Sequence, residues 1–279
     1  MFESMSTKPT APARERRLMC VLAHPDDESL GTGGILARYA AEGVGTYVIS
    51  ATRGERGWPG DPAANPGLEA LGQIRERELR AAAEVLGLRE AAFLDYLDGD
   101  LDRAEPSRAV GKLVTRLRRI RPQVVVTFDP TGYYGHPDHI AISQLTTAAI
   151  VAAADAGYRD AGGRAAHRVA KLYYLAPSER TVAIYERALG PLAMRVGGVE
   201  RRAVAWRDWA ITTHIDAADH WRTVWRAVAC HRSQLPGYEA LRRLPDEDHR
   251  TLWGTQTFYR AMSMVNGGRE LERDLFEGL

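Results

Sequence analysis

Two short motifs of the chain bring histidine and aspartate close together. Residues 23–28 read Ala-His-Pro-Asp-Asp-Glu, and residues 136–139 read His-Pro-Asp-His. Two imidazoles and one carboxylate form a ligand set that suits zinc and leaves room for water and a substrate. We therefore predict His24, Asp27 and His139 as metal ligands.

Two side chains beside these ligands are suited to acid–base chemistry. Asp26 adjoins Asp27, so its carboxylate can face a metal-activated water as a general base. His136 lies three residues before His139, and from a helix start its imidazole can donate to an oxyanion or protonate a leaving amine. Together these residues predict metal-assisted hydrolysis.

Both motifs stand between an apolar run and a segment of helical pattern. The runs at 18–22 and 124–128 are typical of buried strands, and helices are expected at 28–42 and 138–154. In an open α/β sheet, ligands bind at the carboxyl ends of the strands. We therefore expect the two motifs to meet at one edge of a sheet.

The rest of the chain continues the alternation of strands and helices, which predicts an α/β fold with a parallel sheet. Further strands are expected at 44–51, 93–94 and 172–175, and further helices at 68–86 and 110–120. The pattern is less regular afterwards, with a helix expected at 178–189, strand-like stretches within 204–215, an aromatic-rich helix at 220–234 and a strand at 257–262.

These patterns divide the chain into three parts. Residues 1–16 contain Pro, Ser, Thr and charges without the apolar region of a signal peptide, so a disordered tail is expected. Residues 17–177 form the predicted catalytic core, and residues 178–279 are expected to fold over the sheet and complete the pocket without being independent. The Pro/Gly-rich segment 56–67 is a candidate lid.

Composition excludes several classes of protein. A net charge of +1 gives no electrostatic reason to expect nucleic acid as a partner. No apolar run approaches the roughly 20 residues that a membrane span needs, so a cytoplasmic protein is expected. Only two cysteines occur, Cys20 and Cys230, and free thiols are expected rather than a disulfide.

The motifs resemble those of a known family, the PIG-L/LmbE-like de-N-acetylases. The resemblance covers residues 23–28, 52–55 (Thr-Arg-Gly-Glu) and 136–139 in order and spacing, and the His-Arg-Ser-Gln segment at 231–234 is similar to a weaker feature. It implies a Rossmann-like, mostly parallel sheet flanked by helices with a smaller C-terminal α+β part. It also implies removal of acetate from an N-acetylglucosamine-type amide.

The resemblance assigns roles to individual residues. The metal ligands of the family match His24, Asp27 and His139, its base matches Asp26, and its oxyanion-stabilising or acid histidine matches His136. Substrate contacts are implied for a second set: Tyr134, Glu55, Arg75 and Asp98. The implied cofactor is Zn²⁺, with Fe²⁺ fitting the same ligands, and the implied partner is a small amino-sugar molecule; homo-oligomerisation stays open.

Structural interpretations compete with several of these assignments. Glu28 and Asp138 are the residue type favoured at helix starts, Glu55 and Asp98 fit turns, and Arg75 lies on a charge-rich helix that favours a solvated face. A cluster of Trp206, Trp209, Trp221 and Trp225 is expected to pack in the core.

Functional alternatives also remain. An amidase acting on a thiol conjugate or an acylated natural product would use the same site, and a non-catalytic metal- or sugar-binding module would use the ligands alone. The glycines at 31, 33 and 34 lack the spacing of a dinucleotide site, which argues against a nucleotide-dependent enzyme.

Overall fold

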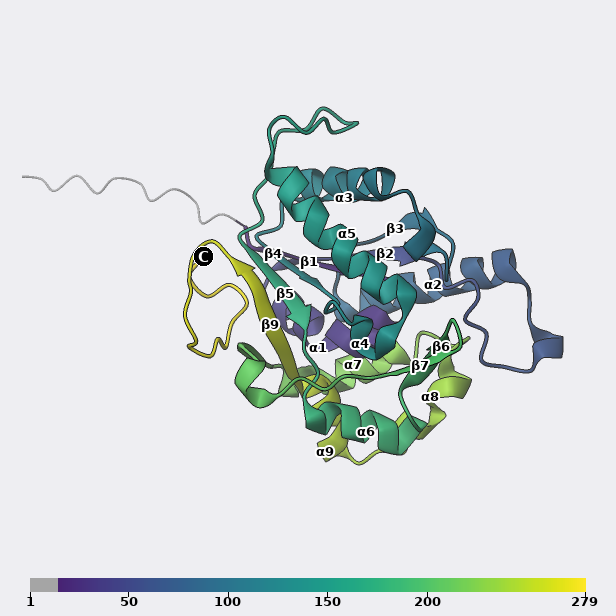
Figure 1. Ribbon diagram of the computed structural model, residues 1–279. Coiled ribbons are helices and arrows are strands. Elements are labelled where there is room, and N and C mark those ends of the chain that lie inside the picture. The colour runs from purple at the N-terminus through teal and green to yellow at the C-terminus, as the bar shows by residue number, and fades with distance from the viewer. Residues whose placement is uncertain (1–14) are drawn as a thin grey trace, which may run out of the picture.

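The computed structural model describes residues 15–279 (Figure 1). Most of the expected N-terminal tail, residues 1–14, lies outside the described residues. Glu15 at its end is placed by ion pairs with Arg17 at 2.9 Å and with Arg89. Within the described part of the chain, no helix combines the length and hydropathy of a membrane span.

A mixed seven-stranded sheet with the order β3-β2-β1-β4-β5-β9-β8 forms the centre of the molecule. The first five strands in this order are parallel, and β9 pairs antiparallel with both β5 and β8. The predicted α/β fold is therefore confirmed. The strands are β1 (Arg17–Leu22), β2 (Gly45–Thr52), β3 (Glu90–Tyr96), β4 (Val124–Thr127), β5 (Lys171–Leu175), β8 (Thr213–Asp216) and β9 (Thr255–Ser263).

Helices cover both faces of this sheet (Figure 1). Helices α3 and α5 pack together on one face, whereas α1 and α2 pack with α7 (Trp221–Val228) on the other. The helices of the first half of the chain are α1 (Asp27–Ala41), α2 (Leu68–Leu86), α3 (Pro106–Ile120), α4 (Gly132–Gly135) and α5 (Pro137–Ala154).

Helix α3 begins four residues before its predicted start at 110, for a local reason. The Glu105 carboxylate accepts hydrogen bonds from the Ser107 and Arg108 N–H groups, and Pro106 occupies the first helical position, where its missing N–H costs nothing. The start of α3 is therefore marked by the acidic residue and the proline that follows it, and not by Val110, the residue at which the helix was predicted to begin.

The C-terminal half adds two strands to the sheet and a layer of short helices beside it. It contains α6 (Glu179–Leu189), α7 (Trp221–Val228), α8 (Leu235–Arg242), α9 (Asp246–His249), a π-helical turn (Arg250–Gly254) and a hairpin of β6 (Ala193–Val196) and β7 (Val199–Arg202). Short 3₁₀ turns lie at Pro62–Ala64, Leu101–Arg103, Asp208–Ala210 and Ala218–His220.

Several predictions for this half are wrong. The helix expected at 220–234 ends at Val228, and the chain turns at 229–234 before α8 begins. The strand expected within 204–215 is limited to β8, and the hairpin at 193–202 was not predicted. The hairpin strands have only four residues each, and none of those residues is buried, so they lack the apolar alternation that marks a strand.

The predicted tryptophan cluster is confirmed for two of its four members. Trp221 and Trp225 pack in a second hydrophobic cluster, together with the fully buried Trp253. Trp209, by contrast, is 88% exposed, and Trp206 stacks on Tyr259 at 5.1 Å. The expectation of free thiols at Cys20 and Cys230 is confirmed.

Candidate metal and catalytic site

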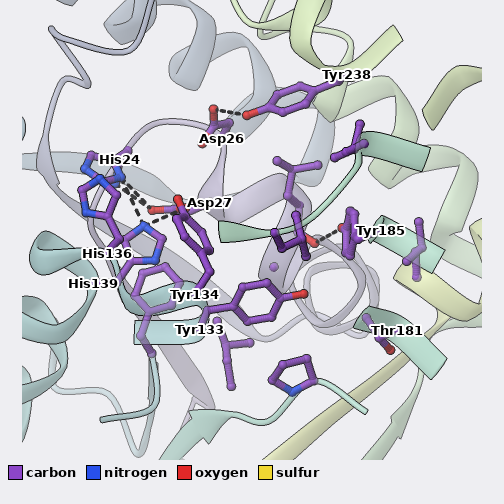
Figure 2. A pocket seen from close by; sticks show the side chains of 18 of the residues that line it. His24, Asp26, Asp27, Tyr133, Tyr134, His136, His139, Thr181, Tyr185 and Tyr238 are labelled. Atoms are coloured by element: carbon purple, nitrogen blue, oxygen red, sulfur yellow. Dashed lines mark hydrogen bonds and ion pairs between the residues drawn. The ribbon is translucent and has the colours of Figure 1, made fainter. Parts of the chain in front are cut away.

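The two histidine motifs meet where the order of the strands reverses. Strands β1 and β4 are neighbours, but the chain proceeds from β1 outward to β2 and from β4 outward to β5. A crevice forms at such a switch point, outside the carboxyl ends of the strands. His24 and Asp27 follow β1, and His136 and His139 follow β4; all four line a cavity of about 370 Å³ (Figure 2).

Polar atoms of three residues converge at one end of this cavity. His24 Nδ1 lies 3.3 Å from His139 Nε2, Asp27 Oδ2 lies 3.7 Å from His24 Nδ1, and Asp27 Oδ1 lies 3.6 Å from His139 Nε2. Ligand atoms about 2.0–2.1 Å from a tetrahedral zinc ion are about 3.3–3.4 Å apart. The arrangement of His24, Asp27 and His139 therefore fits a tetrahedral metal with an open position.

The remaining polar atoms of these ligands are held by the protein. Asp27 Oδ2 accepts the backbone N–H groups of Ala23 and His24 at 3.2 and 2.8 Å, which leaves Oδ1 toward His139. On the other side of the His24 ring, Nε2 lies 3.2 Å from Asp138 Oδ2 and 3.1 Å from Asp98 Oδ1. A proton on Nε2 satisfies these carboxylates and leaves the Nδ1 lone pair for a metal.

Burial and charge shift the titration of these groups. Burial lowers the pKa of His24, but hydrogen bonds with Asp138 and Asp98 outweigh it and raise the pKa to about 10 in the metal-free protein. Burial raises the pKa of Asp27 to about 7, against the attraction of His24. Burial also lowers the pKa of His139 well below its usual value. A bound cation would favour the deprotonated ligands, so protons and metal compete for this site.

Asp138 does more than start a helix. It lies in the first turn of α5, as predicted, but its carboxylate is fully buried and accepts N–H groups of Gly99 at 2.7 Å and Leu101 at 3.1 Å while contacting His24. It therefore joins the loop after β3 to the predicted ligand His24.

Asp26 stands at the N-terminus of α1 in a strained backbone conformation, with φ 103°. Such conformations cost free energy in residues other than glycine and persist where the surroundings fix them. Here the Asp26 N–H donates to Glu28 Oε2 at 2.9 Å, while Asp26 Oδ2 accepts from Arg75 and from the Tyr238 hydroxyl, both at 2.9 Å. The carboxylate lines the cavity beside the predicted metal ligands (Figure 2).

Behind Asp26, a buried pair joins the two halves of the chain. Glu28 Oε1 lies 2.7 Å from His231 Nε2, and both side chains are inaccessible to solvent. Burial lowers the pKa of His231, but the charge of Glu28 outweighs it and raises the pKa. The interpretation of Glu28 as a simple helix-start residue is incomplete, because its carboxylate fixes both Asp26 and the turn at 231.

His136 lies against both histidine ligands. Its ring is 4.7 Å from that of His24 and 4.9 Å from that of His139, measured between centroids. His136 Nδ1 accepts the Asp138 N–H at 3.1 Å, so the neutral ring carries its proton on Nε2. Burial, followed by the charge of His24, lowers the pKa of His136 to about 4.

Three of the four predicted substrate-binding residues line the cavity, and the fourth, Glu55, does not. The Tyr134 ring lies 5.2 Å from His139, edge to face, and lines the cavity. Arg75 is 3% exposed and donates to Asp26 and to the Gly54 and Pro25 carbonyls, so it is not on a solvated face. Asp98 lines the cavity and contacts His24.

Glu55 is outside the cavity lining. It accepts the Asp98 N–H at 3.2 Å, so it stands behind that residue. In the segment 56–67, Gly57 lines the cavity, and its carbonyl accepts from the Gln234 side chain at 2.8 Å.

Sequence reasoning missed Tyr238, His231 and Gln234 as parts of the site. The resemblance of the segment 231–234 to a family feature was a signal for His231 and Gln234. This turn is held by Glu78 on α2, which accepts the backbone N–H and the hydroxyl of Ser233, both at 2.7 Å. Tyr238 had no signal, because its contact with Asp26 spans 212 residues of chain.

Comparisons with known proteins agree with this geometry. Residues 19–150 match the family profile described as PIG-L: GlcNAc-PI de-N-acetylase. A Kineococcus radiotolerans protein named 1D-myo-inositol 2-acetamido-2-deoxy-alpha-D-glucopyranoside deacetylase is 34% identical, over 95% of this chain and 83% of its own. A mycothiol S-conjugate amidase of Streptomyces coelicolor is 31% identical, over 94% of this chain and 97% of its own.

A solved structure gives the same result for the fold. The crystal structure of a conserved protein of Thermus thermophilus superposes with a TM-score of 0.64 at 27% identity, over 90% of this chain and 96% of that one. The family suggested by the sequence motifs is confirmed, and the chain belongs to the PIG-L family of de-N-acetylases.

Proposed function

We propose that this protein is a zinc-dependent N-deacetylase that hydrolyses the acetamide of an N-acetylglucosamine-type amino sugar or its conjugate. The convergence of His24 Nδ1, the Asp27 carboxylate and His139 Nε2 within 3.3–3.7 Å, beside Asp26, carries the proposal. The named relatives support the substrate class, since one is a deacetylase of a 2-acetamido-2-deoxyglucopyranoside.

His24, Asp27 and His139 would hold the metal. A zinc ion there would polarise the amide carbonyl and lower the pKa of a water molecule to near neutrality. Asp98 and Asp138 would orient His24 through its Nε2 atom, as carboxylates commonly do for histidine ligands.

Asp26 would act as the general base. Arg75 and Tyr238 both bind Oδ2, so Oδ1 remains available to accept the proton of the attacking water. When the C–N bond breaks, the protonated carboxyl would deliver this proton to the amine nitrogen. Because the backbone and Oδ2 are fixed in advance, the carboxylate needs little rearrangement for the transfer.

His136 would stabilise the negative charge that develops on the carbonyl oxygen. Its Nδ1 is occupied by the Asp138 N–H, so its Nε2–H is the group that can donate. Tyr134 beside it would contact the carbonyl or a sugar hydroxyl. Asp98 and Arg75 line the cavity and would contact the sugar while holding His24 and Asp26, and Glu55 would act through Asp98.

Acetate release tests the proposal. Protein reloaded with one equivalent of zinc is incubated with a panel of N-acetylglucosaminides, and a chelated sample serves as the control. Zinc-dependent acetate from any member supports the reaction class, whereas no acetate from fully metallated protein contradicts it. Reloading with Fe²⁺ in parallel shows whether both metals sustain turnover.

A second candidate is hydrolysis of the amide in a thiol conjugate. This candidate is supported by the 31% identity to a mycothiol S-conjugate amidase over nearly the whole chain. The same panel extended to S-substituted cysteinyl amides distinguishes the two by the relative kcat/KM. A non-catalytic binding module would show turnover on neither set. The cytoplasmic location and the absence of nucleic-acid partners stay predictions, and the oligomeric state stays open.

A further inference from the structure

The cavity extends well beyond the metal ligands, into a compartment with apolar walls. Six side chains from α1, β5, α6 and the segments that follow α6 and α9 line it, and we call this compartment the apolar arm: Leu30, Leu175, Tyr185, Leu189, Leu192 and Leu252. In Figure 2, Tyr185 and Thr181 lie on the opposite side of the cavity from the three histidines, and the Tyr133 ring lies between.

Several polar side chains beside the arm already have protein partners, whereas the Tyr133 hydroxyl at its entrance makes no hydrogen bond within the described residues. The Tyr185 hydroxyl donates to the Leu30 carbonyl at 3.0 Å and accepts from Trp253 Nε1 at 3.3 Å. The Gln256 side chain bonds two backbone groups of α1 at 2.7 and 2.8 Å, and the Thr257 hydroxyl donates to a backbone carbonyl at 2.6 Å. These groups have little capacity left for a ligand.

The apolar lining and the pairing of most nearby polar groups favour one ligand chemistry. A sugar hydroxyl moved from water into the arm would leave most of its hydrogen bonds unmade, which is unfavourable. A hydrocarbon group has no hydrogen bonds with water to lose. It would cover the apolar surface of Leu30, Leu189 and Leu192, which are only half-buried. The polar groups that could meet a sugar, such as Asp98, Gln234 and Tyr238, line other parts of the cavity.

We propose that the apolar arm receives a hydrocarbon group of the substrate, an alkyl chain or an aromatic ring attached to one side of the scissile amide. This inference rests on the proposed function, because the amide must lie at His24 and His139. Hydrolysis adds water across the C–N bond: the acyl carbon gains an oxygen, and the nitrogen gains a proton and leaves as the amine. The hydrocarbon group belongs either to the acyl part or to a substituent of the amino sugar.

Two substrate series distinguish these sources. The first is glucosamine carrying N-acetyl, N-butanoyl or N-hexanoyl groups, and the second is N-acetylglucosamine carrying a methyl, butyl or hexyl aglycone. Burial of each methylene group in the arm should raise kcat/KM about threefold to fourfold. A rise in the first series assigns the arm to the acyl group, and a rise in the second assigns it to the aglycone. Rates that are flat or falling in both series overturn the inference while leaving the deacetylase function intact.

A pair of matched variants tests the location. Leu189→Asn places a polar group of similar size in the wall of the arm, and Leu244→Asn makes the same change in the same hydrophobic cluster but outside the cavity lining. The quantity compared is the ratio of kcat/KM between the longest and shortest member of the responsive series, which is independent of the fraction of active protein. Leu189→Asn should lower this ratio at least fivefold, and Leu244→Asn should preserve it. An unchanged ratio in Leu189→Asn contradicts the proposed location.

Binding without turnover supplies an independent readout. Zinc-loaded Asp26→Asn protein is titrated calorimetrically with the methyl and hexyl glucosaminides, and with N-acetyl- and N-hexanoylglucosamine. One of the hexyl or hexanoyl compounds should bind at least tenfold more tightly than its short partner, with a more negative heat-capacity change. If the wild-type protein hydrolyses no amide, the proposed function fails, but this measurement still tests whether the arm binds a hydrocarbon group. Equal affinities for long and short ligands would contradict that role of the arm.

Discussion

Two buried clusters of polar and charged side chains in this molecule differ in how completely their polar atoms are paired. At one side of the sheet, the Glu272 carboxylate is surrounded by donors from β5, β8, β9 and the C-terminal segment: Lys171, Tyr173, Thr213, Arg260 and Asn266. At the carboxyl ends of β1 and β4, by contrast, ring nitrogens of His24 and His139 and the Asp27 carboxylate lie 3.3–3.7 Å from one another. The first cluster is complete, because both oxygens of its carboxylate have donors, whereas the ligand atoms of the second could be completed by a cation.

The comparison teaches how to distinguish a structural cluster from a functional one. Burial and charge are shared, because Glu272 is 2% exposed and His139 is also 2% exposed. What differs is the balance of donors and acceptors. Where donors match acceptors, the cluster stabilises the fold; where acceptors converge without donors, a ligand supplies the difference.

The largest expected effect comes from Asp26→Asn. The amide cannot accept the proton of the attacking water, so kcat should fall about 10²- to 10⁴-fold. Because Asp26 is not one of the three converging ligands, zinc content should stay at the wild-type level. Steady-state kinetics and metal analysis of the same sample check both parts, and turnover near that of the wild type would remove Asp26 from the mechanism.

Glu272→Gln probes the complete cluster. Removal of the negative charge leaves Lys171, which is inaccessible to solvent, without its counter-ion at 2.6 Å. Loss of one partner from a buried ion pair costs about 3–5 kcal/mol of folding stability. Urea denaturation should show this loss, while zinc affinity stays constant; Glu277→Gln, at an exposed position of the same segment, is the control. A change in zinc affinity without a change in stability would show that the Glu272 cluster supports the metal site and not the fold.

Asp138→Asn should have a smaller effect, and it should affect the metal. The variant keeps the size of the side chain but weakens its acceptance from His24 Nε2 and two backbone N–H groups. Loss of such an orienting carboxylate typically costs about 10- to 100-fold in metal affinity. Competition with a chromogenic chelator measures it, with the exposed Asp102→Asn in the neighbouring turn as the matched control. Equal zinc affinity in both variants would show that Asp138 does not support the ligand.

The smallest expected effect is a dependence of stability on pH that originates in the complete cluster. Burial raises the pKa of Glu272, but Lys171 and the other donors outweigh it and lower the pKa to about 2, below its ordinary value of 4.5. Between these values the unfolded chain binds more protons than the folded one, so stability should be constant above about pH 4.5 and fall toward pH 2. Urea midpoints of metal-free protein at pH 5 and pH 3 measure the fall, which should be smaller in Glu272→Gln. An identical fall in both proteins would assign it to other carboxyl groups.

Much of the fold could be predicted from the sequence because its signals are local. Helix α2 begins and ends at the predicted residues, since its apolar spacing is regular and Gly87 ends it in the left-handed conformation with φ 74°. The first five strands were found from short apolar runs. The site motifs were equally local, because each lies within a few residues of a strand end.

The parts that could not be predicted depend on distant contacts. Glu28 and Asp138 satisfy the local rule for helix starts, and nothing nearby in sequence shows that one binds His231, 203 residues away, and the other the His24 ring. Arg75 has the sequence surroundings of a solvated residue, but it turns inward to Asp26. The apolar arm is assembled from segments between Leu30 and Leu252, so no single stretch of sequence indicates it.

The position of β9 has a consequence for how the chain is made. This strand, from Thr255 to Ser263, lies between β5 and β8, so β8 cannot join the sheet before it. During synthesis at roughly 5–20 residues per second, β5 would wait about 4–18 s for its neighbour, with its edge unpaired. An unpaired edge is a template for association with other chains. We therefore expect the nascent protein to be more open to aggregation during this interval than after β9 has paired.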